Sequence, residues 1–96
     1  MLIRHTMESG IMSLKLCCQL DVTNRAAAVL DIQGLLYAHR PSRVVIELPP
    51  NTPSSATLSA MLRTERLCGT LGIPFGLAPS SRQAARLLQA SDQVGP

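Results

Sequence analysis

The chain has 96 residues and a formal net charge of +3, with 46% apolar and 16% charged residues. This balance excludes the weakly hydrophobic, highly charged composition of disordered chains, and the length suits one domain. We therefore expect a single domain over residues 1–96. Its core should span about 11–92, with an edge strand and turn at 1–10 and a frayed tail at 93–96.

The composition also argues against two classes of partner. The nine Lys and Arg residues are spread along the chain, and few aromatic side chains could stack on bases, so we expect no nucleic-acid partner. No apolar run approaches the ~20 residues of a membrane span, and the N-terminus lacks the apolar region of a signal peptide. We expect a cytoplasmic protein without direct membrane insertion, for which Met7 and Met12 are alternative starts.

The first half of the chain predicts a hairpin followed by a helix. A short strand at 2–6, a turn at 8–10 with Gly10 at positive φ, and a strand at 11–20 with period-two alternation form the hairpin. Capping side chains at 21–24 precede a helix at 25–39. Its apolar face repeats at helical spacing, and Pro41 ends it: Val29, Ile32, Leu35 and Leu36 lie on that face.

The second half predicts two further strands and two helices. The apolar run at 43–48 is typical of a strand buried on both faces and parallel to its neighbour. Thr52 as N-cap and Pro53 as first residue start a helix that ends near Cys68. A short strand follows at 73–78, where Pro74 requires an edge or irregular position.

A last helix at 82–90 completes the order β-β-α-β-α-β-α. This order predicts an α/β fold, a mixed sheet of about four strands with helices packed against it.

The thiols and imidazoles do not suggest a metal site. Three cysteines form no disulfide framework, and only two histidines, His5 near the N-terminus and His39 near a helix end, could add ligands. Cys17 and Cys18 would point to opposite faces of the strand at 11–20, and we interpret them and Cys68 as buried thiols. We expect no metal and no cofactor.

No catalytic residues emerge from the remaining pattern. The six acidic residues form no useful pair, and no glycine-rich phosphate loop is present, so neither an enzyme nor a ligand-binding protein is favoured. Ser54 and Ser55 lie in the first turn of the predicted helix, where N–H groups and the helix dipole stabilise negative charge. Spacing alone favours a capping role for them over phosphorylation.

Four segments, in this order, resemble the STAS family (sulphate transporter and anti-sigma factor antagonist domains). The family motifs are G-E-L-D-x-x-T/N before the first helix, a central V-V-L-D-L-S strand, D-S-S-G-L, and G-x-x-L-x-L-x-x-P/S-x before the last helix. The matching segments are C-Q-L-D-V-T-N at 18–24, V-V-I-E-L-P at 44–49, P-S-S-A-T at 53–57 and L-G-I-P-F-G-L-A-P-S at 71–80. The resemblance covers about residues 11–92 and implies a STAS-like fold.

The resemblance implies a bacterial anti-sigma factor antagonist. Such proteins bind a serine-kinase anti-sigma factor and free the sigma factor for transcription, and phosphorylation of the first serine of D-S-S-G breaks the complex. That serine maps to Ser54, with Ser55 as the second choice of phosphoacceptor. The partner-binding residues implied by the family are Asp21, Thr23, Asn24, Arg25, Asn51, Thr52, Ser54 and Ser55.

Departures from the family motif keep two alternatives open. Pro53 and Ala56 replace the acid and the glycine of D-S-S-G, and Cys18-Gln19 replaces Gly-Glu. One alternative is a STAS-like accessory subunit of a membrane transport ATPase. The other is a divergent STAS interaction domain that is not phosphorylated. The oligomeric state stays open in every case.

Overall fold

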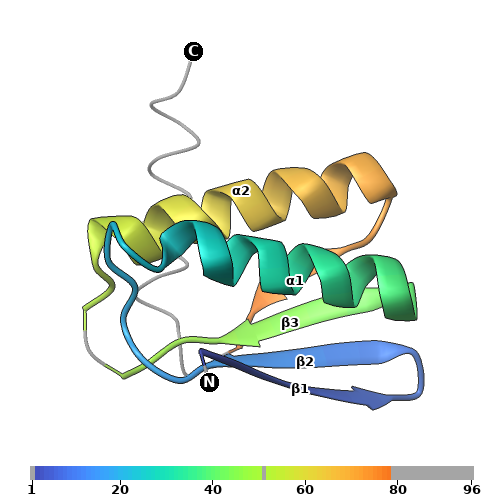
Figure 1. Ribbon diagram of the computed structural model, residues 1–96. Coiled ribbons are helices and arrows are strands. Elements are labelled where there is room, and N and C mark those ends of the chain that lie inside the picture. Colours follow the sequence, from blue (N-terminus) through green and yellow to red (C-terminus); the bar gives the residue numbers. More distant parts are fainter. Residues whose placement is uncertain (1, 51, 79–96) are drawn as a thin grey trace.

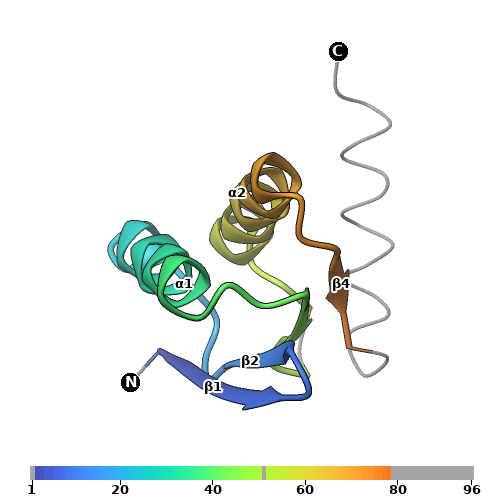
Figure 2. The ribbon, with the colours of Figure 1, turned by 90° about the vertical axis from the view of Figure 1, so that its right-hand side faces the viewer.

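The computed structural model describes residues 2–50 and 52–78, which form a four-stranded sheet with two helices on one of its faces (Figures 1 and 2). The elements are β1 (Ile3–Glu8), β2 (Ile11–Leu16), α1 (Arg25–His39), β3 (Arg43–Glu47), α2 (Ser55–Leu71) and β4 (Phe75–Leu77). The strand order is β1-β2-β3-β4; β1 pairs antiparallel with β2, and the other neighbours are parallel. A small α/β fold with a mixed sheet is therefore confirmed, and the helix predicted at 82–90 lies outside the described residues.

The hairpin between β1 and β2 turns on two residues with positive φ, Ser9 at 53° and Gly10 at 80°. Two such residues match the tight turn that best follows the twist of paired strands. The carbonyl of Gly10 accepts hydrogen bonds from the Ser42 N–H at 2.8 Å and its hydroxyl at 3.0 Å. These bonds tie the hairpin to the start of β3. The first strand runs two residues further than predicted, to Glu8.

β2 ends at Leu16 and not at residue 20 as predicted. Beyond it, Cys17 and Cys18 are both exposed, so the prediction of buried thiols is wrong for this pair. The chain leaves the sheet here because Leu20 turns into the core, where it is 2% exposed. Cys68 is buried as predicted, and burial, together with the charge of Glu65, raises the pKa of its thiol to about 11.

α1 has the predicted bounds, and the residues at its C-terminus explain where it ends. Arg40 adopts the left-handed conformation, with φ 46°, and its N–H still donates to the Leu36 carbonyl. Pro41 follows and cannot continue the helix. No helix in the part of the chain that the structure describes is long and apolar enough to cross a membrane.

The sheet differs from expectation at β3. The prediction that both faces of this strand are buried is wrong for the described residues: Val44 and Ile46 are buried, whereas Val45 and Glu47 are partly exposed. The reason is that α1 and α2 cover the same face of the sheet (Figure 2). β4 lies at the sheet edge as predicted, and the Pro74 carbonyl just before it accepts from the Val44 N–H at 2.9 Å.

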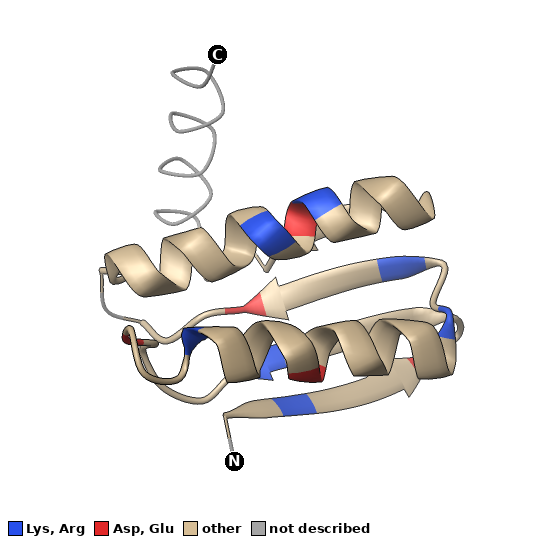
Figure 3. Cartoon of the chain, turned by 45° about the horizontal axis from the view of Figure 1, so that its top comes forward, with Lys and Arg blue, Asp and Glu red and all other residues tan. Residues whose placement is uncertain are grey.

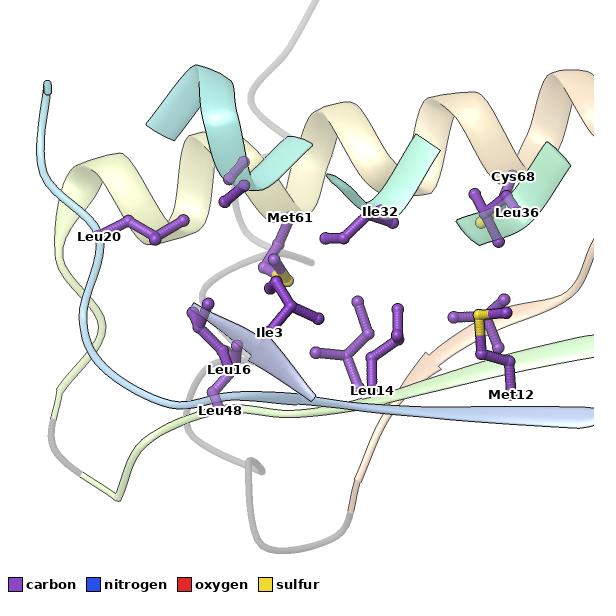
Figure 4. Packing of buried hydrophobic residues seen from close by; sticks show 14 of the residues in the cluster. Ile3, Met12, Leu14, Leu16, Leu20, Ile32, Leu36, Leu48, Met61 and Cys68 are labelled. Atoms are coloured by element: carbon purple, nitrogen blue, oxygen red, sulfur yellow. The ribbon is translucent and has the colours of Figure 1, made fainter. Parts of the chain in front are cut away.

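The core fills the space between the helices and this one face of the sheet (Figure 4). It is aliphatic and sulfur-containing, as the near absence of aromatic residues predicts. The fully buried large apolar side chains come from β2, α1, β3 and α2, and they include Met12, Leu14, Leu16, Ile32, Leu36, Val44, Ile46 and Met61. The only buried polar side chains in the described residues are Thr57 and Thr64 of α2.

The hairpin geometry predicts opposite effects for two glycine substitutions. Gly10→Ala should destabilise the protein by about 1–2 kcal/mol, because alanine resists φ of 80° and its Cβ would lie 2.8 Å from Ser42 Oγ. Gly34→Ala is the control: this helical position is open, so the protein should gain about 0.5–1 kcal/mol. Urea denaturation of both variants measures the difference, and equal midpoints would contradict it.

Candidate functional site

The site lies where the chain leaves β2 and β3 at their carboxyl ends. These strands are parallel neighbours, so the loops that follow them, 17–24 and 48–54, emerge at the same edge of the sheet. Open α/β sheets commonly bind their ligands at this edge. These loops and the first residues of α1 and α2 carry the predicted partner-binding residues that the structure describes, so those at 21–25 and those at 52–55 lie at the same edge of the sheet.

Ser54 is the N-cap of α2. Its backbone is extended, with φ −68° and ψ 161°, and its Oγ accepts from the Thr57 N–H at 3.1 Å. The prediction of Thr52 as N-cap and Pro53 as first helical residue is therefore wrong by two residues. Thr52 is exposed and Pro53 is buried ahead of the helix, which begins at Ser55. The hydroxyl of Ser54 also reaches the loop after β2, which favours this residue as the cap.

That hydroxyl joins the two loops. Ser54 Oγ donates to the Leu20 carbonyl at 2.7 Å and lies 2.9 Å from Thr57 Oγ1. A hydroxyl has one hydrogen, so the shorter contact, to the Leu20 carbonyl, takes it. A phosphate on Ser54 would remove this donor and place negative charge beside a carbonyl oxygen.

Gln19 also takes part in these hydrogen bonds, and no sequence pattern had indicated it as a site residue. Its Oε1 accepts from the Ser54 N–H and from Thr57 Oγ1, both at 2.9 Å. In a capping box, a Glu or Gln in the helix itself usually accepts from the cap N–H. Here Gln19, 35 positions earlier, takes that role, while Thr57 Oγ1 accepts from the Leu20 N–H at 2.9 Å. We call Gln19, Leu20, Ser54 and Thr57 the capping cluster.

Asp21 organises the turn before α1. Its Oδ1 accepts from the Thr23 N–H at 2.8 Å, from the Thr23 hydroxyl and from the Asn24 N–H at 3.1 Å. Asn24 Oδ1 accepts in return from the Asp21 N–H at 2.8 Å. The prediction that side chains of this turn cap α1 is wrong: Asn24 is the N-cap residue and makes no side-chain cap hydrogen bond, because the Asp21 carboxylate bonds within the turn itself. The hydrogen bonds from Thr23, and then from Asn24, hold the pKa of the Asp21 carboxyl below its usual value of 3.8.

The predicted partner-binding residues differ in exposure. The structure leaves Asp21, Thr23, Thr52 and Ser55 exposed, whereas Asn24, Arg25 and Ser54 are half-buried. Asn51 lies outside the described residues. An acidic position in the loop before α1 and a basic position at the start of that helix stand close together in Figure 3, which adds charge of both signs to this end of the molecule.

The two histidines lie close together in the structure. His5, predicted near a frayed end, lies in β1, and His39 is the last residue of α1; their ring centroids are 5.4 Å apart. Residues 2–50 and 52–78 contain no group of three or more His, Cys, Asp or Glu side chains arranged to hold a metal ion.

Comparison with known proteins gives no relative: no family model matches the chain, and neither does any curated protein.

The capping cluster predicts a large difference between two buried threonines of α2. Thr57→Val should destabilise the protein by about 1–3 kcal/mol, because the buried Leu20 N–H loses its acceptor. Thr64→Val is the matched control, since its hydroxyl donates only to the Ala60 carbonyl of the same helix; we expect a change below about 1 kcal/mol. Denaturant unfolding compares them, and equal losses would contradict the role of the cluster.

The Asp21 turn predicts a pH-dependent contribution to stability. Because the pKa of Asp21 is lowered on folding, its charge stabilises the fold above pH 3.8, and this contribution disappears as the pH falls through the lowered value. The wild type should therefore exceed Asp21→Asn in stability near neutral pH, and the gap should close below pH 3.8. Chemical denaturation across this range tests it; a gap that stays constant to about pH 2 would refute the assignment.

Proposed function

We propose that the chain is a STAS-like protein-binding module that binds a serine-kinase anti-sigma factor and so regulates sigma-factor-dependent transcription. The observation that carries the proposal is the capping cluster. It joins the segment resembling G-E-L-D to the segment resembling D-S-S-G by direct hydrogen bonds between Gln19 or Leu20 and Ser54 or Thr57. Two motifs distant in sequence thus contribute to one surface.

The chemistry around this cluster suits contact with a protein. Exposed polar side chains of Asp21, Thr23, Thr52 and Ser55 surround the half-buried Ser54. Polar rims of this kind supply hydrogen bonds around the centre of a protein interface. The Asp21 turn is also held rigid by its own hydrogen bonds, which reduces the ordering cost of binding.

Phosphorylation of Ser54 would regulate such a surface through its local structure. A phosphoryl group adds a charge of about −2 and replaces the hydrogen that Ser54 donates to the Leu20 carbonyl. The loop after β2 would then lose its direct bond to α2. Loss of that bond would displace the Asp21 turn, which directly follows Leu20.

A second candidate is favoured by the same geometry. Pro53 is buried where the family has an acid, and the hydroxyl of Ser54 is already engaged in the capping cluster. Both features fit a STAS-like interaction domain that is not phosphorylated, such as the accessory subunit of a membrane transport ATPase. In that case the same surface binds its partner permanently.

Affinity capture with Ser54 variants separates these proposals. Tagged wild-type protein captured from a lysate of its native cells should retain a serine-kinase anti-sigma factor, identified by mass spectrometry. Ser54→Asp should reduce this recovery by about tenfold or more, because the added charge and lost hydrogen bond act at the contact surface. Recovery of a transport ATPase with no kinase would favour the second candidate.

Thr70→Asp is the control, since Thr70 is an exposed hydroxyl residue of the same helix but lies near the end of α2 that is distant from Ser54. It should keep recovery within about threefold of wild type. Ser54→Ala tests the hydroxyl alone; loss of this cap should lower stability by about 1 kcal/mol, so each variant must be folded at the capture temperature. Identical capture by Ser54→Ala and Ser54→Asp would rule out a phosphorylation switch at this position.

A further inference from the structure

Two histidines lie close together where β1 meets α1. His5 comes from the edge strand β1 and His39 from the last position of α1, and they are the two histidines of the chain. Their ring centroids are 5.4 Å apart, their planes are tilted by 43°, and both side chains are exposed. The fold alone brings them together, because they are far apart in sequence.

This separation fits two imidazoles bound to one metal ion. With Zn–N bonds of about 2.0–2.1 Å and tetrahedral angles, the centroids of two such rings lie about 5 Å apart. A tilt of 43° is not a parallel stack, so rotation about the side-chain bonds is enough to turn a nitrogen of each ring toward a common point. Exposure leaves the remaining coordination positions to water.

The local charges also favour a cation. His39 ends α1, where the helix dipole places partial negative charge. A hollow of about 410 Å³ between β1 and α1 is lined by His5 and Asp31, with no Lys or Arg among its lining residues, whereas a second hollow beside His5 is lined by Arg4, Lys15 and Glu47. The basic neighbours in sequence are Arg4, beside His5, and Arg40, beside His39, and the side chains of both are exposed to solvent, which screens their charge.

We propose that His5 and His39 bind one borderline divalent transition-metal ion, Zn²⁺ or Cu²⁺, with water as the other ligands. Imidazole nitrogen is a preferred ligand of both ions, whereas Mg²⁺ prefers oxygen ligands. The bound ion would link the edge strand β1 to the end of α1 and so stabilise the N-terminal strand. This site is independent of the function proposed above.

Metal titration of the full chain tests the proposal. The background is Cys17→Ser with Cys18→Ser, because these exposed thiols would also bind Zn²⁺. Calorimetry with ZnCl₂ should give one ion per chain, and saturating Zn²⁺ should raise Tm by about 4–8 °C, reversibly with a chelator. MgCl₂ should change neither readout.

Single substitutions then identify the ligands. His5→Gln and His39→Gln should each weaken Zn²⁺ binding by about tenfold or more while leaving the metal-free Tm near wild type, since both side chains are exposed. The matched control, His39→Ala with Ala38→His, keeps two histidines but moves one imidazole around the helix, and it should behave like the single variants. Absence of binding to the background protein, or unchanged affinity in any of these variants, would overturn the proposal.

Discussion

The hydrogen bonds of the capping cluster hold the loop after β2 against the first turn of α2. Ser54 Oγ uses its acceptor site for its own helix, through the Thr57 N–H, and its single hydrogen for the Leu20 carbonyl. Gln19 then accepts from two donors that the helix start would otherwise leave unsatisfied. Because the Leu20 N–H is buried and donates to Thr57, loss of one hydroxyl would leave a polar group unpaired in the core.

Strand order explains why this cluster forms where it does. β2 and β3 are adjacent and parallel, so the loops that leave them meet at one edge of the sheet. Leu20 enters the core beside α2, and Asp21 follows it directly into the turn before α1. One short segment therefore anchors the loop in the core and also starts α1. A change at Ser54 reaches the Asp21 turn through two covalently joined residues.

The same cluster sets two demands on Ser54 that oppose each other. As a cap, the residue must keep its hydroxyl hydrogen directed at the Leu20 carbonyl. As the proposed phosphoacceptor, it would have to present the oxygen to a kinase and give that hydrogen up. In that proposal, the free energy of opening the cluster would set how readily a kinase modifies Ser54. A module switched by phosphorylation would benefit from a capping cluster that opens easily. A permanently bound module would gain nothing from such opening.

Local sequence determined the elements whose signals lie within a few residues of each other. The end of α1 follows from Pro41, and the hairpin turn follows from Gly10, because prolines and glycines act on neighbouring backbone groups. Only the tertiary structure decided the cap of α2, since the choice of Ser54 depends on the distant Gln19. It also decided the exposure of the thiols after β2 and the meeting of the two histidines, because each requires knowing where separate segments come together in space.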